Sequence, residues 1–452
     1  MTRLKKATTK SRNDSEHTLS HSLTHSLSFP FLIGGGVIKI LQNPQIGSAF
    51  QITKVLCRDV NKPRDFELPE HVTYTEDWKE AIKDVDMVVE LIGGTTLAKD
   101  AVYTALKSGV HVVTANKALV AEHMQEIEDI LAETDNKAKL GYEAAVGGGI
   151  PIIRSLQTSV VSADQVNEVA GILNGTTNFM LSKMASESAS YDDVLKEAQA
   201  LGFAEAEPSA DVEGYDARAK ISILARLGLG VRIPALDIPC AGITRLTVDD
   251  FDYATTLNST IKLIATVRRV PSAKDSKQTT VQAFVAPAIV PLSGIIGNVN
   301  GATNVVQIGS ESLGSSHLLG QGAGRFPTAN SVVADMVAIQ NQTNAHTAFP
   351  VEADTDFIFD EDYESPFYIR LNVKDGTGII SDIGRICAEN GISIDSILQN
   401  PITDSNNVPF VITTDSCRRS AVKKLCHSTR QQPWCLEDPL VMPLLPEPKE
   451  EE

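Results

Sequence analysis

Residues 85–96, Val85-Asp86-Met87-Val88-Val89-Glu90-Leu91-Ile92-Gly93-Gly94-Thr95-Thr96, carry the clearest fold signal in this 452-residue chain. The apolar run 85–92 predicts a buried strand, and a helix is expected over 96–108. Working outward, we also expect strands over 51–57 and 111–114, and a helix over 77–84. Apolar strands that alternate with helices are typical of βαβ units, so the sequence predicts an α/β fold with a Rossmann-type parallel sheet.

Ligands of such sheets lie beyond the carboxyl ends of the strands. The segments 92–96 and 114–117 both follow predicted strands. Small residues such as Gly94 and Thr95 let a cofactor approach the backbone, and Lys117 is expected to project over the crevice.

The phosphate-binding turn of this domain is incomplete in the sequence. The required pattern is a strand, G-x-G-x-x-G and then a helix. Only a glycine triplet that contains Gly34 and Gly36 precedes the expected helix, and Pro30 interrupts the segment where the first strand belongs. The sequence therefore predicts that the N-terminal strand and part of the nucleotide loop are missing.

Basic residues follow the second predicted strand at Arg58, Lys62 and Arg64. An acidic residue there favours NAD, whereas basic residues favour the 2′-phosphate of NADP. A solvated basic turn is an equally good interpretation.

A glycine-rich turn over 141–150 contains Glu143. One carboxylate followed by closely spaced carbonyls suits a hard monovalent cation, which prefers oxygen ligands. A crossover hinge between two domains explains the turn equally well.

An acidic loop runs from Gly202 into a helix expected over 215–227. The apolar stripe of this helix contains Lys220, with Asp216 four residues earlier on the same side. A buried ammonium group needs a carboxylate partner, and its pKa moves toward the working range. An ordinary surface pair is the alternative. Because Glu205 and Asp211 are also near in sequence, we favour a site that binds an amino group and moves a proton.

The second half of the chain contains an α+β region and a smaller module. Residues 151–345 carry alternating helices and strands, and the turn 320–328 precedes a helix expected over 329–339, whose N-terminus can bind an anion. Residues 354–365 are acidic and irregular, which is typical of a linker. A β-α-β-β pattern over 366–416 then indicates a regulatory ligand-binding module.

Composition excludes several classes of function. The formal net charge of −17 argues against binding to nucleic acid or to an anionic membrane. The six cysteines show no C-x-x-C or metal-ligand spacing, which suits a reducing compartment. No run of 18 apolar residues exists, so we expect no transmembrane helix.

Residues 1–28 are rich in Ser, Thr, His and basic residues. A plastid or mitochondrial transit peptide, a disordered tail and a wrongly assigned start or exon are the three interpretations. We expect a cytoplasmic protein, or a plastid one if this segment is a targeting peptide.

Four motifs occur at the segments 171–180 (Gly-Ile-Leu-Asn-Gly-Thr-Thr-Asn-Phe-Met), 205–220, 114–117 (Thr-Ala-Asn-Lys) and 322–328 (Gly-Ala-Gly-Arg-Phe-Pro-Thr). Together they resemble those of homoserine dehydrogenase. Residues 374–379 and 390–393 resemble an ACT domain, which this family often carries for feedback by an amino acid. The resemblance extends over about 34–446.

The resemblance implies an oxidoreductase that reversibly reduces L-aspartate 4-semialdehyde to L-homoserine with NADP or NAD, in threonine, methionine and isoleucine biosynthesis. Lys220 would protonate the developing alkoxide, with Lys117 as the second lysine of the relay. Glu205 and Asp216 would bind the substrate, with Asp211 in support. The candidate cofactor-binding residues are Gly34, Gly36, Arg58, Gly94, Thr95, Lys117 and Gly324.

The resemblance also implies a Na⁺ or K⁺ site formed by Glu143 and the carbonyls of Val146, Gly148 and Ile150, and a homodimer or higher homo-oligomer. An amino-acid effector would bind the ACT-like module. The expected divisions are 1–32 (N-terminal segment), 33–147 (dinucleotide binding), 148–350 (catalysis and dimerisation), 351–365 (linker) and 366–440 (ACT-like).

Two departures from the family keep other functions open. Glu207 stands where the family usually has Asp, and the start of the cofactor domain is missing. A non-catalytic amino-acid-binding protein that has lost dinucleotide binding is the main alternative. A different Rossmann enzyme acting on an amino-acid semialdehyde is disfavoured by the density of motifs over 171–220.

Overall fold

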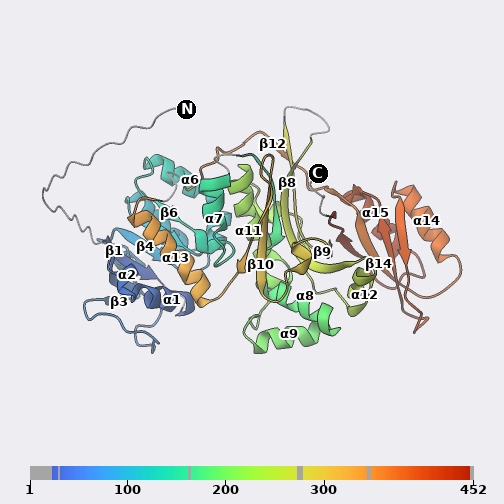
Figure 1. Ribbon diagram of the computed structural model, residues 1–452, viewed down its shortest axis with the longest axis horizontal. Helices are drawn as coiled ribbons and strands as arrows, with labels where there is room; N and C mark the ends of the chain where they lie inside the picture. Colours follow the sequence, from blue (N-terminus) through green and yellow to red (C-terminus); the bar gives the residue numbers. More distant parts are fainter. Residues whose placement is uncertain (1–22, 29–30, 161–163, 272–277, 344–347, 448–452) are drawn as a thin grey trace, which may run out of the picture.

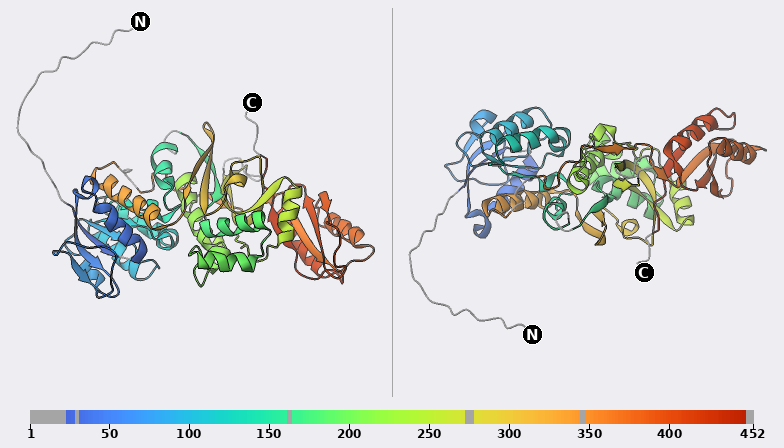
Figure 2. Two further views of the ribbon diagram at one scale, coloured as in Figure 1. Left: turned by 60° about the horizontal axis from the view of Figure 1, so that its bottom comes forward. Right: turned by 90° about the horizontal axis from the view of Figure 1, so that it is seen from above.

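Three domains follow one another along the longest axis of the molecule (Figure 1). A domain with a long, mainly antiparallel sheet lies between the N-terminal domain and the C-terminal module, and the two turned views agree on this order (Figure 2). The computed structural model describes residues 23–28, 31–160, 164–271, 278–343 and 348–447.

The N-terminal domain has the predicted Rossmann-type sheet. Its six strands lie in the order β3-β2-β1-β4-β5-β6, and all neighbours pair in parallel. The strands are β1 (Leu23–Ser28), β2 (Phe50–Leu56), β3 (Thr73–Thr75), β4 (Met87–Glu90), β5 (His111–Thr114) and β6 (Leu140–Gly141).

The prediction that the N-terminal strand is missing is wrong. Residues 23–28 form β1 in the centre of the sheet, paired with β2 on one side and β4 on the other. The polar sequence Leu-Thr-His-Ser-Leu-Ser has a low intrinsic preference for a strand. Hydrogen bonding to a neighbouring strand on each side stabilises the strand conformation instead. The transit-peptide and tail interpretations fall largely on residues 1–22, which lie outside the described residues.

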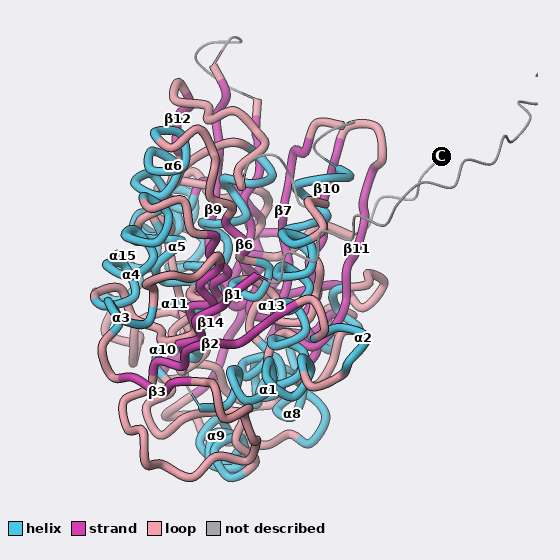
Figure 3. The backbone as a smooth tube through the Cα atoms, turned by 90° about the vertical axis from the view of Figure 1, so that its left-hand side faces the viewer, coloured by secondary structure: helices cyan, strands magenta, loops and turns pink. Residues whose placement is uncertain are grey.

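Helices cover both faces of this sheet (Figure 3). Helices α1 (Phe31–Leu41) and α13 (Arg325–Gln340) pack on the face that receives Met87 and Val89. Helices α4 (Leu97–Lys107) and α6 (Met124–Glu133) pack on the opposite face with Val88. Because α13 comes from the region that we assigned to the catalytic domain, the cofactor domain is discontinuous in sequence. The shorter helices here are α2 (Pro44–Gly47), α3 (Trp78–Ala81), α5 (Lys117–Glu122) and α7 (Ile152–Ser155).

The central domain is built on a sheet of order β11-β10-β7-β8-β9-β12. Its strands are β7 (Val166–Ile172), β8 (Ser259–Val270), β9 (Thr279–Pro291), β10 (Thr303–Ser310), β11 (Gly314–Gln321) and β12 (Phe357–Phe359). Since β12 pairs in parallel with β9, the predicted irregular linker is partly an edge strand of this sheet. The linker prediction was wrong there, because an acidic composition hid the apolar Phe-Ile-Phe segment.

Five helices of the central domain matter for the site. They are α8 (Gly175–Glu187), α9 (Tyr191–Ala200), α10 (Ser209–Val212), α11 (Tyr215–Leu224) and α12 (Val248–Thr256). Helix α11 ends earlier than predicted, and one turn of π-helix over Ala225–Leu229 continues it.

The C-terminal module has a four-stranded antiparallel sheet of order β15-β16-β14-β18. Its elements are β14 (Phe367–Val373), α14 (Ile379–Glu389), β15 (Ile394–Leu398), β16 (Val408–Thr414), α15 (Arg419–Arg430) and β18 (Leu440–Pro443). A small sheet pairs β13 (Glu364–Ser365) with β17 (Cys417–Arg418). The predicted β-α-β-β pattern was therefore too short, since a second helix and a fourth strand complete a βαββαβ unit.

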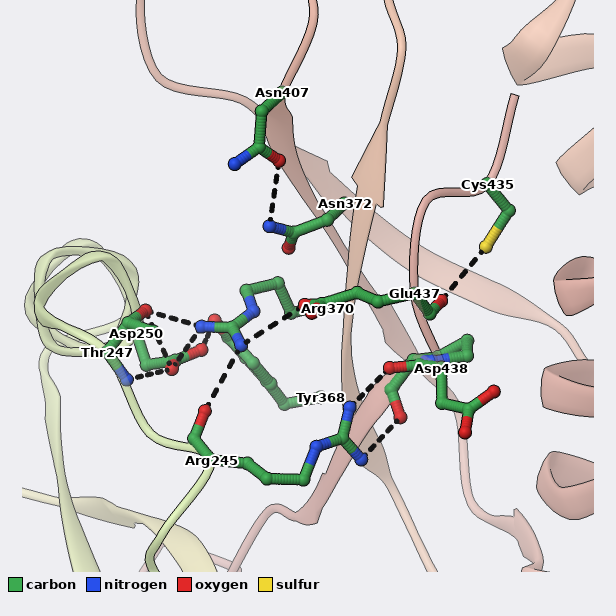
Figure 4. Close-up of polar contacts among 11 residues, drawn as sticks. Arg245, Thr247, Asp250, Tyr368, Arg370, Asn372, Asn407, Cys435, Glu437 and Asp438 are labelled. Atoms are coloured by element: carbon green, nitrogen blue, oxygen red, sulfur yellow. Dashed lines mark hydrogen bonds and ion pairs between the residues drawn. The ribbon is translucent and has the colours of Figure 1, made fainter. Parts of the chain in front are cut away.

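A buried ion pair anchors this module to the central domain (Figure 4). Arg370 donates to Oδ2 of Asp250 at 2.6 Å, and the hydroxyl of Tyr368 donates to Oδ1 of Asp250 at 2.8 Å. The side chains of Arg370 and Asp250 are 4% and 0% exposed. The carbonyl of Arg245 accepts a further hydrogen bond from Arg370 at 3.2 Å. The two domains thus share a charged contact from which water is excluded.

Candidate active site

Helix α11 brings a lysine and a carboxylate into the interior. It packs against α5 of the cofactor domain. Its apolar residues Ala217, Ile221 and Leu224 are buried, and Lys220 and Asp216 are only 7% and 5% exposed. The helix begins after Gly214, whose φ of +81° favours glycine. The prediction that Lys220 lies on a buried stripe is confirmed, and the alternative of a surface pair is excluded.

Asp216 bridges two lysines from different domains. Nζ of Lys220 donates to Oδ2 of Asp216 at 2.7 Å and to the carbonyl of Leu173 at 2.7 Å. Nζ of Lys117 forms an ion pair with Oδ1 of Asp216. Lys117 is the first residue of α5, which Asn116 caps by accepting from the amide of Leu119 at 3.1 Å. The structure therefore joins residues about a hundred positions apart in one cluster.

The two lysines differ in their affinity for a proton. Burial lowers the pKa of Lys220, against the opposing effect of the Asp216 carboxylate. The same carboxylate raises the pKa of Lys117, whose side chain is 45% exposed. Although burial opposes it, the two ammonium groups hold the pKa of Asp216 well below its usual range. Lys220 is therefore the group suited to exchange a proton, while Lys117 and Asp216 keep their charges.

A second carboxylate, Asp211, is tied to the first by an asparagine. Nδ2 of Asn174 donates to Oδ1 of Asp211 at 2.6 Å and to Oδ2 of Asp216 at 2.9 Å. Burial raises the pKa of Asp211. Sequence reasoning quoted Asn174 within a motif and gave it no role. The signal that could have found it is an N-cap residue type directly before the helix that begins at Gly175.

Glu205 lies at the rim of the cluster. It is exposed on the loop before α10, where its carbonyl accepts from Nε2 of Gln199 at 3.1 Å. Its negative charge contributes to the raised pKa of Lys117. The neighbouring Glu207 accepts from the amide of Ser209 at 3.1 Å instead.

The cofactor-domain crevice lies at the ends of β4 and β5. The fully buried Glu90 accepts from the amide of Ile92 at 2.6 Å and from Oγ1 of Thr114 at 2.5 Å, which fixes both strand ends. Nδ2 of Asn116 donates to the carbonyl of Gly94 at 2.7 Å. Gly94 has a φ of +72°, and among the described residues no heavy atom would lie within 4 Å of a Cβ added there. Gly94 therefore borders open space, and the cofactor-binding role of Gly94 and Thr95 stays a prediction.

The prediction that Gly34 and Gly36 form the phosphate-binding turn is wrong. Both lie inside α1, which begins at Phe31. A Cβ on Gly36 would lie 2.9 Å from Cβ of Ala329 and 3.0 Å from the carbonyl of Arg325. The triplet allows α1 and α13 to approach closely. From the sequence pattern alone, glycines with this packing role cannot be distinguished from glycines of a phosphate-binding loop.

The basic residues after β2 divide into two kinds. Arg64 donates to the carbonyls of Val60, Lys62 and Asp59 at 2.8–3.0 Å, so it orders its own loop. Arg58 is exposed two residues after the end of β2. Of the three, Arg58 is the better candidate for a cofactor phosphate.

The turn before α13 packs on the glycine-rich turn over 147–149. Gly324 has a φ of +122° and stands at the N-cap of α13. A Cβ on Gly148 would lie 2.5 Å from the carbonyl of Gly322, and Oγ of Ser331 donates to the carbonyl of Gly148 at 2.6 Å. The two turns therefore support each other at the junction of the first two domains.

Glu143 lies buried beneath these turns. It accepts from the amides of Ile153 at 2.9 Å and Arg154 at 2.8 Å. Burial and the neighbouring Asp335 raise the pKa of Glu143 to about 7. The segment that holds Val146, Gly148 and Ile150 is also buried. In the described part of the chain, no three His, Cys, Asp or Glu side chains could hold a metal ion together. A cation here would depend on backbone carbonyls and on relief of the Glu143–Asp335 repulsion.

No helix within the described ranges is both long and apolar enough to cross a membrane.

Known proteins match nearly the whole chain. The family model described as "Homoserine dehydrogenase, NAD binding domain" matches residues 32–141, that described as "Homoserine dehydrogenase" matches 151–337, and that described as "ACT domain" matches 367–425.

Two homoserine dehydrogenases give long sequence matches. The enzyme of Bacillus subtilis is 37% identical over 393 residues, which cover 84% of this chain and 88% of that protein. The enzyme of Neisseria gonorrhoeae is 36% identical over 430 residues, which cover 91% and 95%. The crystal structure of a homoserine dehydrogenase from Thiobacillus denitrificans has a TM-score of 0.83 at 32% identity and covers 94% of this chain and 98% of that one.

Proposed function

The chain belongs to the homoserine dehydrogenase family, and from this premise we propose how its own residues interconvert L-homoserine and L-aspartate 4-semialdehyde. The observation that carries the proposal is the buried Lys220, held between Asp216 and the carbonyl of Leu173 beside the cofactor domain. Incubation of the protein with homoserine and NADP⁺ should produce reduced nicotinamide, which its absorbance reports.

Lys220 is the proton donor and acceptor of this reaction. In aldehyde reduction its ammonium gives a proton to the developing alkoxide, and in homoserine oxidation the neutral amine takes the hydroxyl proton. The bound nicotinamide supplies or accepts the hydride. Because burial lowers the pKa of Lys220, it releases its proton more readily than an exposed lysine does.

Lys117 and Asp216 supply fixed charges. Asp216 keeps Lys220 oriented along the 2.7 Å hydrogen bond. The raised pKa of Lys117 supports a role as a permanent cation that stabilises the oxyanion. The charges of Asp211 and Glu205 also act on Lys117, and these two carboxylates are the candidate partners for the substrate ammonium group.

Replacing Glu205 with glutamine should raise KM for homoserine about 10-fold with little change in kcat, because a charge-assisted contact at an exposed rim is lost. Steady-state kinetics with saturating cofactor measure it. The exposed neighbour Glu207 is the matched control, since it bonds Ser209 and should tolerate the same change. An increase in KM for the cofactor alone would place Glu205 in a different subsite.

The nicotinamide cofactor binds the N-terminal domain, whose family model is an NAD-binding one. The residues available for it are Gly94, Thr95, Lys117, the turn at Gly324 and Arg58. The exposed guanidinium of Arg58 after β2 supports NADP over NAD as the preferred form.

A monovalent cation is proposed at Glu143 and the carbonyls of Val146, Gly148 and Ile150. A cation would offset the burial of the Glu143 carboxylate and its repulsion by Asp335, which together raise the pKa of Glu143 to about 7. Protons and the cation then compete for one carboxylate. The activation by K⁺ or Na⁺ and the rise in Tm that it causes should therefore grow as pH rises through about 7.

Titrations of activity and Tm with KCl on both sides of that pH measure this. Tetramethylammonium chloride keeps the ionic strength constant. In Glu143→Gln the cation dependence should disappear. An equal response to tetramethylammonium would contradict a specific site.

Self-association through the central domain is also proposed. Leu292, Ile295, Leu313 and Leu319 expose 41–59% of their surface around β11 and the loop that precedes β10. An apolar edge of this kind favours a second copy of the chain. Light scattering of the purified protein tests it.

An amino-acid effector is proposed for the ACT module, with a short route to the active site. Arg370 of the module bonds the carbonyl of Arg245 at 3.2 Å. Two residues earlier, the amide of Ile243 donates to the carbonyl of Val212 at 2.8 Å, directly beside Asp211. A shift of the module can therefore move Asp211, one of the carboxylates proposed to bind the substrate, through one backbone segment.

A further inference from the structure

We propose that Asn174 is a positioning residue for the reaction, whose side-chain amide holds Asp211 and Asp216 in the arrangement that lets Asp216 bridge the two lysines. The inference rests on the proposed role of Lys220. Asn174 is 4% exposed and stands between the end of β7 and the start of α8.

The orientation of the amide is fixed by its surroundings. The backbone amide of Thr177 can only donate, and it donates to Oδ1 of Asn174 at 2.8 Å. Nδ2 must therefore face the carboxylates, where it reaches Asp211 at 2.6 Å and Asp216 at 2.9 Å. Both amide hydrogens are used, one for each carboxylate. An asparagine meets this requirement, because it donates twice without adding a charge.

Charged groups face this cluster from several elements. Asp216 and Lys220 come from α11, Lys117 from α5 and Asp211 from α10, and Glu205 lies at the rim. Without the amide, Asp211 and Asp216 would repel each other across the space it fills. Oδ2 of Asp216 accepts from both Asn174 and Lys220, so loss of the amide would leave that oxygen to Lys220 alone. The ammonium form of Lys220 would then be favoured.

Helix capping alone does not explain this residue. An N-cap needs only an acceptor, and Ser or Asp serves about as well as Asn at that position. Replacement by Ser retains the cap of α8 and removes the two-hydrogen donor. Replacement by Asp retains the shape and the cap, and it adds a negative charge beside Lys220. These two variants therefore separate the positioning role from the structural one.

The test is the pH dependence of homoserine oxidation, whose rising limb reports the neutral form of Lys220. In Asn174→Ser, kcat should fall about 10–100-fold, because a small misplacement of catalytic groups is costly. The midpoint of the limb should move to higher pH. Asn174→Asp should move the midpoint in the same direction. This second variant keeps the test decisive if the serine variant does not fold.

Asn178 provides the matched control. It is 1% exposed on the same helix, and its Nδ2 donates to the carbonyls of Val299 at 3.0 Å and Thr303 at 2.9 Å. Asn178→Ser loses the same number of hydrogen bonds away from the carboxylates, so it should lower Tm and leave the midpoint unchanged.

Two results would overturn the inference. One is a wild-type midpoint in both Asn174 variants, and the other is an equal shift in Asn178→Ser. Full activity of Lys220→Ala would instead refute the proposed role of Lys220, so the two failures are distinguishable.

Discussion

Lys220→Ala should lower kcat in both directions by about 10²–10⁴-fold while the protein stays folded, because removal of a general acid or base has an effect of this size. The variant should also lose the rising pH limb of homoserine oxidation, since the amine that must be neutral is gone. Below the pKa of Lys220 aldehyde reduction is favoured, and above it oxidation is favoured. A pH profile of kcat in each direction measures the change.

Two arginine variants separate charge from proton transfer. Lys220→Arg keeps a cation beside Asp216, but a guanidinium does not release its proton in this pH range. It should therefore be nearly as inactive as Lys220→Ala. Lys117→Arg keeps the permanent charge that we propose for Lys117, so it should retain far more activity. A fully active Lys220→Arg would assign proton transfer to another group.

Much of the fold follows from local sequence patterns. The strand at His111–Thr114 lies where the apolar run predicts it, because the run is continuous and bounded by turn residues. The strand at Leu23–Ser28 could not be predicted, since its support comes from two parallel neighbours that begin 27 and 64 positions later along the chain. The glycine triplet was predicted to form a turn for a similar reason. Its packing against Ala329 depends on a residue that is remote in sequence.

The candidate active site also combines features that local sequence predicts with features that depend on remote residues. The spacing of Asp216 and Lys220 on one helix predicts their ion pair. The contact of Asp216 with Lys117 and the bridge made by Asn174 join segments 37 or more residues apart, which no local pattern shows. Burial also decides which lysine exchanges a proton, and burial comes from tertiary packing.

The second large effect is expected at the interface between domains. Arg370→Ala should lower stability by about 3–5 kcal/mol, because it leaves the carboxylate of Asp250 buried without its cation. Asp250 lies on α12, and burial already raises its pKa against the effect of Arg370. Arg245, which donates to the carbonyl of Pro439, stays as a second link between the domains. Denaturant unfolding followed by tryptophan fluorescence measures the change, since Trp434 lies in the ACT module.

An exposed arginine in the same module is the control for this effect. Arg385 pairs with Glu389 at 2.8 Å, and both side chains are more than half exposed. Arg385→Ala should change stability by at most about 1 kcal/mol, because water screens and replaces such a pair. Replacing Asp250 and Arg370 together with apolar residues should recover much of the stability, since no unpaired charge remains. If the double variant is instead as unstable as Arg370→Ala, the packing around Tyr368 holds the module in place and the ion pair is secondary.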